Sequence, residues 1–273
     1  MKLLPVSICS IALLLGRATI FGENKEVSKK PMPDFCQMDT RHGELPKGGI
    51  NYCTPTAYSN ILVYLDNNGF PNMMSQEDPS PCDQLELIKK LGEYMNTSPE
   101  SGTRNSGTIG GLRKYVSEKG YKTEVEIRGI TITGETSSSE PVNPRWLRKK
   151  FSNGYFAVLR IAWCNYDSES DVYKVIGNHS LTAFDFEKDE MEREVVLIHD
   201  PALRSGLEPK TECCSFILVK NGKISHVGVD YSADGYWKLD GLTIKEGANC
   251  AIIDEAIVFK ISELSGASKN ISK

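Results

Sequence analysis

Cys53 is the residue whose surroundings best fit a chemical role. It lies in the segment Gly48-Gly49-Ile50-Asn51-Tyr52-Cys53-Thr54-Pro55, directly before a run of apolar residues with helical spacing. A thiol at a helix N-terminus lies at the positive end of the helix dipole, which favours the thiolate that attacks carbonyl carbons. The N–H groups of a first helical turn can also donate to a developing oxyanion. The alternative interpretation is that Cys53 is half of a disulfide or a small buried apolar residue.

His179 and Asp200 are the candidates for the groups that would activate this thiol. His179 precedes the run Ser180-Leu181-Thr182-Ala183-Phe184, and Asp200 ends the run Val195-Val196-Leu197-Ile198-His199. The midpoint between the two falls in a polar turn, so an antiparallel hairpin would bring both side chains to its open end. A carboxylate there can hold the tautomer and orientation of the imidazole while the other ring nitrogen faces the thiol. The alternatives are a hydrogen-bonded histidine at a strand end and an aspartate that caps a turn.

The other histidines do not form a metal-binding pattern. His199 alternates with Asp200 along its strand, so its side chain should point to the opposite face, and it is interpreted as structural. The spacing of His199, Asp200 and His226 matches no dedicated metal-binding motif. The sequence therefore implies neither a metal nor a cofactor.

The elements that would position these residues fall into a helical first half and a stranded second half. The first helix begins at Cys53 and is stopped by Asn67-Asn68-Gly69. Further helices are predicted at 83–95 with Asp83 as N-cap, at 108–119, and after Asn143-Pro144. Strands are expected at 121–133, 155–163, 180–186, 194–198 and 250–261, with a hairpin of 216–219 and 223–227 around Asn221-Gly222. Helices followed by antiparallel strands are typical of the α+β class.

The chain length, the net charge and the N-terminal sequence limit the class of protein. The 273 residues are 40% hydrophobic, which is enough for one sizeable core. The net charge is −4 and no basic stripe is present, which argues against a nucleic-acid partner. Positively charged Met1-Lys2, a short apolar run and an abrupt polar change after residue 22 indicate a secretory signal peptide. We expect a signal peptide at 1–22, a flexible leader at 23–34, one domain at 35–265 and a tail at 266–273. The protein is then secreted or periplasmic, without a membrane span after signal removal.

Export also determines how the cysteines are interpreted. Eight are present, and Cys9 would leave with the signal, so seven remain. An oxidising compartment favours disulfides, and an odd number leaves at least one free thiol. Cys53 is the best candidate for that free thiol. The pairing among the other six is left open.

Three of these segments resemble the papain-like cysteine peptidases of the bacteriocin-processing type and their secreted relatives. In that family a cysteine closely followed by proline starts a long helix, a Gly-His leads a strand, and an Asp-Pro ends the next strand. The matching residues here are Cys53 with Pro55, Gly177 with His179, and Asp200-Pro201. The resemblance covers roughly residues 35–202. It implies a papain-like fold, in which the helix that carries the nucleophile packs against a C-terminal antiparallel sheet.

The chain departs from the family pattern at three places. Thr54 follows the cysteine where the family usually has glycine, and Asn178 is inserted between Gly177 and His179. Lys47 occupies the place of the family's glutamine, which donates a hydrogen bond to the oxyanion. Asn51 is the first candidate to supply that amide instead, and Gln37 is the second.

Together these observations predict an exported cysteine hydrolase, a thiol protease that cleaves peptide bonds in a peptide or protein substrate. Cys53 would attack as the nucleophile, His179 would carry the proton and Asp200 would orient His179. Two alternatives stay open. The same order of residues could serve acyl transfer, as in transglutaminase-like proteins. The missing glutamine favours a catalytically inactive module that holds a peptide in the same cleft.

Overall fold

The computed structural model describes residues 29–74, 79–129, 138, 140–202, 204 and 206–264. The expected signal peptide at 1–22 and the tail at 266–273 lie outside these residues, as does the first half of the leader, 23–28. The helices are η1 (Pro46–Gly49), α1 (Cys53–Asn67), α2 (Pro81–Tyr94), α3 (Asn105–Glu118) and α4 (Pro144–Ser152). The strands are β1 (Tyr121–Gly129), β2 (Phe156–Asp167), β3 (Val172–Lys188), β4 (Glu194–His199), β5 (Glu212–Leu218), β6 (Lys223–His226), β7 (Val229–Ser232), β8 (Trp237–Asp240) and β9 (Cys250–Glu263).

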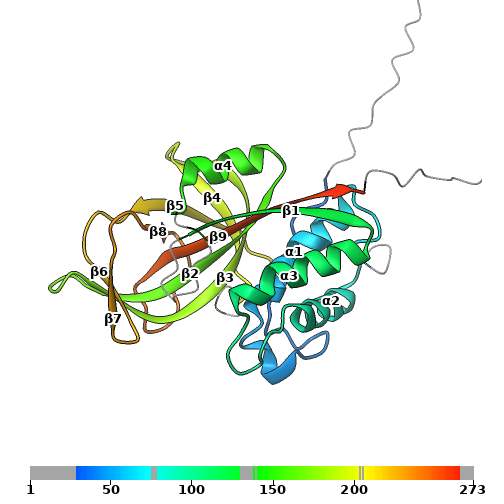
Figure 1. Cartoon of the computed structure of the whole chain (residues 1–273), viewed down its shortest axis with the longest axis horizontal. Helices are drawn as coiled ribbons and strands as arrows, with labels where there is room; N and C mark the ends of the chain where they lie inside the picture. Colours follow the sequence, from blue (N-terminus) through cyan, green and yellow to red (C-terminus); the bar gives the residue numbers. More distant parts are fainter. Residues whose placement is uncertain are drawn as a thin grey trace, which may run out of the picture.

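The molecule has a helical end and a stranded end. The helices α1, α2 and α3 cluster at one end of the sheet, and the rest of the sheet extends away from them (Figure 1). This mixture of helices and a large sheet confirms the expected α+β class at this level. Among the described residues no helix is long and apolar enough to cross a membrane.

The helix α1 begins at Cys53, as predicted, and is buried along most of its length. Ala57, Tyr58, Ile61 and Leu62 are fully buried. They belong to a core that also includes residues of α2, α3, β1, β2 and β9. Because α1 is covered on nearly all sides, its N-terminus has a fixed place relative to the sheet.

The helices α2 and α3 start earlier than predicted. Ser80 is the N-cap of α2 and forms a capping box with Asp83, so the prediction of Asp83 as N-cap is wrong. Pro81 occupies the first turn, where its missing N–H costs nothing. The start of α3 is glycine-rich because α3 lies against the backbone of Met95, where a Cβ on Gly107 would come within 2.1 Å of the Met95 carbonyl oxygen. The helix α4 begins at Pro144 with Asn143 as N-cap, as predicted.

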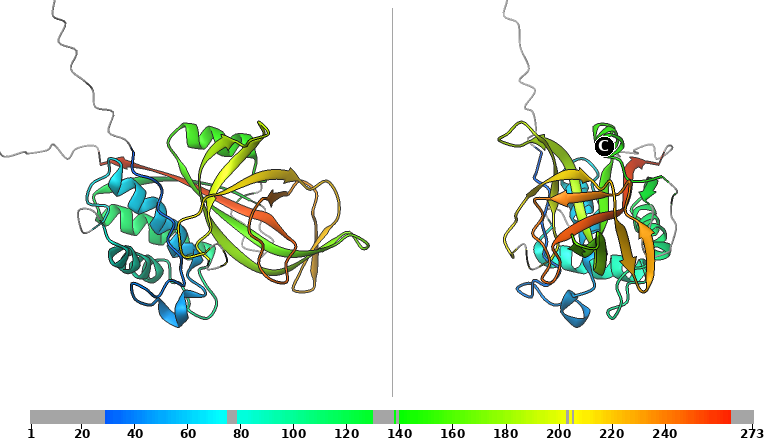
Figure 2. Two further views of the ribbon diagram at one scale, coloured as in Figure 1. Left: turned by 180° about the vertical axis from the view of Figure 1, so that it is seen from behind. Right: turned by 90° about the vertical axis from the view of Figure 1, so that its left-hand side faces the viewer.

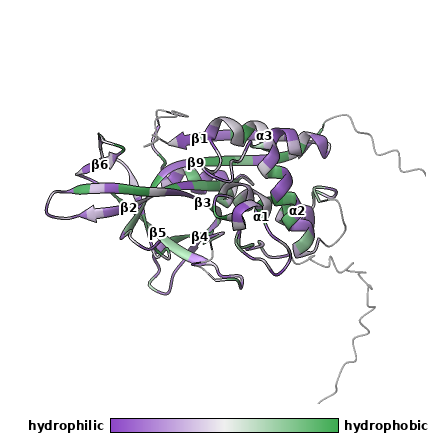
Figure 3. Cartoon of the chain, turned by 90° about the horizontal axis from the view of Figure 1, so that it is seen from below, coloured by the Kyte–Doolittle hydropathy of each residue, from purple (hydrophilic) through white to green (hydrophobic). Residues whose placement is uncertain are grey.

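Part of the nine-stranded sheet closes on itself. β2 pairs with β3 and β9, and the ring continues through β8, β5 and β4 back to β3. Figure 2 shows this ring from two sides. A second apolar core fills it, with Leu159, Ile161, Trp163, Leu181 and Ile198 among its members. Hydrophobic residues, green in Figure 3, run along β9.

The hairpin of β2 and β3 is much longer than the sequence pattern indicates. β3 has 17 residues, so His179 lies in the middle of a strand and not at the start of one. The prediction of a strand that begins at Ser180 is wrong because the first half of β3 extends past the apolar core. There Lys174 and Asn178 are exposed, and their polarity resembles that of a loop.

The predicted hairpin around Asn221-Gly222 does not form. Both edges of β5 are occupied, by β4 and by β8. β6 instead pairs in parallel with β3 and antiparallel with β7. Gly222 has φ +96°, and the next residue, Lys223, donates a backbone hydrogen bond of 2.9 Å to Asp171 next to β3. A turn therefore forms at Gly222, but β6 pairs with β3 because both edges of β5 are already occupied.

The expected disulfides are not found in the described part of the chain. All seven cysteines from Cys36 to Cys250 are thiols. Cys213 and Cys214 are neighbours in β5, so one is exposed and the other is buried. Cys164 and Cys250 are directly opposite each other in β2 and β9.

Candidate active site

The nucleophile candidate is the first residue of α1. Cys53 is partly exposed, and Tyr52, which precedes it, contributes no side-chain cap to the helix. The N–H groups of Cys53 and Thr54 therefore belong to the first turn, where a helix provides no partner for them. Pro55 has no N–H at all, so the free donors are concentrated next to the sulfur. This arrangement can stabilise negative charge on the sulfur and on an atom bonded to the carbon that it attacks.

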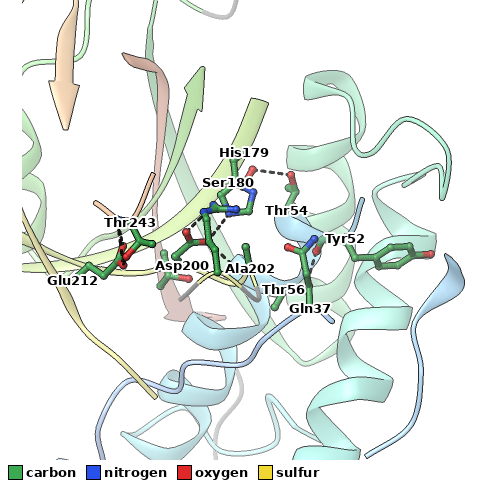
Figure 4. A network of polar contacts seen from close by, with 12 residues as sticks. Gln37, Tyr52, Thr54, Thr56, His179, Ser180, Asp200, Ala202, Glu212 and Thr243 are labelled. Atoms are coloured by element: carbon green, nitrogen blue, oxygen red, sulfur yellow. Dashed lines mark hydrogen bonds and ion pairs between the residues drawn. The ribbon is translucent and has the colours of Figure 1, made fainter. Parts of the chain in front are cut away.

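Hydrogen bonds fasten this end of α1 to the middle of β3 (Figure 4). Thr54 Oγ1 and Ser180 Oγ are 2.8 Å apart. One turn further, Thr182 Oγ1 donates to the carbonyl oxygen of Ala57 at 3.0 Å. All four residues are buried, so these bonds are shielded from water. The threonine after the cysteine, a departure from the family pattern, thus contributes to docking of the helix.

His179 and Asp200 meet at the place that the hairpin argument predicts. His179 Nε2 and Asp200 Oδ1 are 2.6 Å apart, and Oδ1 also accepts from the backbone N–H of Ala202 at 2.9 Å. His179 is 7% exposed and Asp200 is 2% exposed. Because Nε2 faces the carboxylate, Nδ1 is the ring nitrogen left for the thiol of Cys53. The structure brings all three predicted residues together.

Two further residues surround this pair, and the sequence pattern did not indicate their role. Trp163 stacks on His179, with 6.1 Å between the ring centroids. The Arg204 guanidinium lies over the Trp163 ring, 4.6 Å from its centroid. The Nη2 atom of Arg204 is 2.7 Å from Asp200 Oδ2. The arginine therefore balances the charge of the buried carboxylate. Nothing in the sequence spacing linked Arg204 to Asp200.

The electrostatics of the site favour an ion pair between sulfur and imidazole. Burial raises the pKa of the Cys53 thiol, but the hydrogen bond and charge of His179 lower it to about 7. Burial lowers the pKa of His179, but the charge and hydrogen bond of Asp200 raise it to about 9. Between these two pH values the sulfur is a thiolate and the imidazole is protonated.

Gln37 joins the segments on the two sides of the site. Its Nε2 donates to the carbonyl oxygens of Gly49 at 2.9 Å and Ile50 at 3.0 Å, just before Cys53. Its backbone N–H donates to the carbonyl oxygen of Pro201 at 2.7 Å, just after Asp200. Gln37 therefore fixes the loop of the nucleophile relative to the loop of the carboxylate. No sequence signal could reveal this, because the three segments are far apart in the chain.

One of the two glycines before Cys53 allows the close approach to Gln37. Gly48 has φ +67° and Gly49 has φ +77°. A Cβ on Gly49 would lie 1.8 Å from the Gln37 carbonyl oxygen, whereas the nearest atom to a Cβ on Gly48 is 3.9 Å away. In the structure, the close approach at Gly49 is to the backbone of Gln37.

The first candidate for the oxyanion amide has another partner. Asn51 Nδ2 donates to the carbonyl oxygen of Pro99 at 2.7 Å. In this arrangement both Asn51 and Gln37 use their amide groups to hold loops. The donors that remain next to the sulfur are the backbone N–H groups at the start of α1.

The other histidines have the positions expected of structural residues. His199 is 4% exposed; its Nδ1 is 2.9 Å from the Pro33 carbonyl oxygen and its Nε2 is 3.0 Å from Thr211 Oγ1. His226 lies at the end of β6, which pairs with the first residues of β3, whereas β4 pairs with its last residues. Neither takes part in the contacts of Cys53, His179 and Asp200.

No protein-family model matches the chain, and no curated protein sequence matches it. The function therefore has to be inferred from the geometry of the site.

The pH dependence of Cys53 alkylation tests this geometry. With iodoacetamide, the rate at Cys53 should rise with pH around a midpoint of about 7, because only the thiolate reacts. In His179→Ala the midpoint should move up by about 2 pH units, because burial of the thiol persists without its partner. His226→Ala is the matched control and should leave the midpoint unchanged. Site-resolved mass spectrometry separates Cys53 from the exposed Cys82 and Cys213; an unmoved midpoint in His179→Ala would contradict the ion pair.

The two glycines allow a matched test of the Gln37 contact. Gly48→Ala should cost about 1 kcal/mol of unfolding free energy, which is the strain of a left-handed backbone. Gly49→Ala combines that strain with the clash against Gln37 and should cost about 3 kcal/mol or more. Urea unfolding curves measure both. Equal losses in the two variants would show that the contact with Gln37 is not tight.

Proposed function

We propose that the protein is a cysteine hydrolase that cleaves peptide bonds with Cys53 as nucleophile, His179 as acid and base, and Asp200 as the group that orients His179. The observation that carries the proposal is the convergence of three residues: a thiol at a helix N-terminus, the imidazole that lowers its pKa to about 7, and a carboxylate 2.6 Å from that imidazole. A buried histidine and aspartate would not need a partly exposed thiol for a structural role. The partial exposure of Cys53 is what a substrate requires.

The chemistry follows from the ion pair. The Cys53 thiolate attacks the carbonyl carbon of a peptide bond, and the oxyanion that forms accepts hydrogen bonds from backbone N–H groups at the start of α1. The protonated His179 gives its proton to the leaving amine. A water molecule then attacks the acyl-enzyme as His179 takes a proton from it, and Cys53 is released. Asp200 keeps the imidazole in one orientation throughout.

The fold supports placing the protein among the papain-like peptidases. A buried helix carries the cysteine at its N-terminus, a mostly antiparallel sheet carries the histidine, and the aspartate follows the next strand. We include secretion or a periplasmic location in the proposal. It rests on the N-terminal sequence, which lies outside the described residues.

A second candidate is a peptide-binding module without turnover. One observation favours it: the amides of Asn51 and Gln37 both hold loop carbonyls, so the oxyanion would be stabilised by backbone donors alone. Loss of one side-chain donor of this kind reduces kcat by about 10²–10³ in a serine protease. Such a protein would still bind peptides and keep a reactive thiol.

Cleavage of a fluorescent casein by the full chain tests the proposal. Wild-type protein should release peptides, Cys53→Ala should retain its fold and lose at least about 10³-fold of the activity, and an epoxide inhibitor of cysteine peptidases should label Cys53. Cys213→Ala removes an exposed thiol away from the site and should match the wild type.

The alternative functions give different results in this assay. Unchanged cleavage by Cys53→Ala would rule out the hydrolase. Binding of casein peptides without cleavage, with a reactive Cys53, would favour the binding module. Incorporation of an added amine in place of water would favour acyl transfer.

A further inference from the structure

Arg160 is a charged residue near the candidate site that has no role in the chemistry above. It lies in β2 and is partly buried. Its Nη1 atom is buried and finds no hydrogen-bond partner within the described residues. A buried donor without a partner is costly, and a guanidinium carries five donors in a planar fork. Such a group is typical of a site that receives a ligand.

Pairing in the sheet places Arg160 on the face that the helices cover. Its direct cross-strand neighbours are Ser180 in β3 and Glu255 in β9. Residues directly opposite each other have their side chains on the same face of the sheet. Ser180 contacts Thr54 at the start of α1, and Glu255 Oε2 accepts from Asn105 Nδ2 at the start of α3. Arg160 therefore lies between the N-termini of two helices.

Arg160 also marks the boundary of the helical layer. Two residues before it on the same face, Val158 belongs to the core beneath α1. Two residues after it, Ala162 belongs to a separate cluster at the far end of the sheet. Arg160 and Cys53 are both partly exposed, as expected at this boundary.

The charged groups and helix dipoles around Arg160 allow an anion to bind beside it. The N-termini of α1 and α3 contribute positive ends of helix dipoles. Glu255 is the acidic group that faces Arg160, and its carboxylate also binds Asn105. After the stronger effects of burial and of His179, the charge of Arg160 contributes to the lowered pKa of Cys53. A positive charge that acts on the reactive sulfur also acts on a ligand bound beside it.

We propose that Arg160 binds a carboxylate of the substrate next to the scissile bond, either an acidic side chain or the free C-terminus of a peptide. The inference rests on the proposed function and names its substrate class, because a planar guanidinium and a carboxylate form paired hydrogen bonds. It makes Arg160 a specificity-determining residue and gives it no part in the proton transfers of His179.

Competing alkylation of the full chain tests the charge at this position without needing a substrate. Iodoacetate carries a carboxylate and iodoacetamide does not, so the ratio of their rates at Cys53 measures attraction of an anion. This ratio should fall about tenfold in Arg160→Met. It should be largely retained in Arg160→Lys, which keeps the charge, and unchanged in Arg145→Met, which removes an exposed arginine on α4. The imidazolium of His179 is present in all variants, so only differences between them count.

The outcomes separate this inference from the proposed function. An iodoacetate-to-iodoacetamide ratio that is equal in wild type and Arg160→Met overturns the role of Arg160, whatever the activity. A rate at Cys53 that does not depend on His179, with a ratio that depends on Arg160, overturns the hydrolase and leaves an anion site. A Cys53 that reacts with neither reagent overturns both.

Cleavage of a mixed peptide library distinguishes the two sources of the carboxylate. With amidated C-termini, enrichment of Asp or Glu at one position beside the cleaved bond identifies an acidic side chain. Cleavage that requires free C-termini identifies the terminal carboxylate. Either preference should be lost about tenfold in Arg160→Met. Identical preferences in the wild type and in that variant would overturn the proposal.

Discussion

The docking of the first turn of α1 against the middle of β3 is the contact on which the candidate site depends. Thr54 meets Ser180, and Ala57 accepts from Thr182, so the helix is fastened to the strand by side chains of both elements. β3 is itself held by β2 on one edge and by β4 on the other. The sulfur therefore faces an imidazole whose strand is held at His179 by Ile161 of β2. A helix free to slide along the strand would separate the two groups.

A buried set of charges follows from this contact. Burial alone would raise the pKa of Cys53 and lower that of His179, which would leave both groups neutral. Asp200 reverses the outcome because it favours the protonated imidazole, which in turn favours the thiolate. Arg204 balances the carboxylate, and Trp163 fills the space between the arginine and the imidazole. Each member lowers the cost of burying the next, so removing one affects all of them.

The structure also shows which sequence patterns were local and which were not. The start of α1 at Cys53 and the start of α4 after Asn143 were predictable because capping and periodicity act within a few residues. The start of α2 was misplaced by a few residues, because Ser80 and Asp83 are both acceptable caps and only the backbone distinguishes them. The hairpin at Asn221-Gly222 failed because the partner of a strand is decided by which sheet edges are free. Pairing with β2 and β6 likewise extends β3 past the residues whose polarity suggested a loop.

The sequence by itself determined the helix start at Cys53, the α+β class, and the hairpin spacing that brings His179 to Asp200. These features depend on short-range chemistry: a dipole, a cap, and the period of two along a strand. Only the tertiary structure decided that Gln37 joins the loops on both sides of the site, that Arg204 neutralises Asp200, and that Arg160 lies beside Ser180. These residues come from segments far apart in the chain. They become neighbours only when the ring of strands closes and α1 docks on it, and no local pattern encodes that closure.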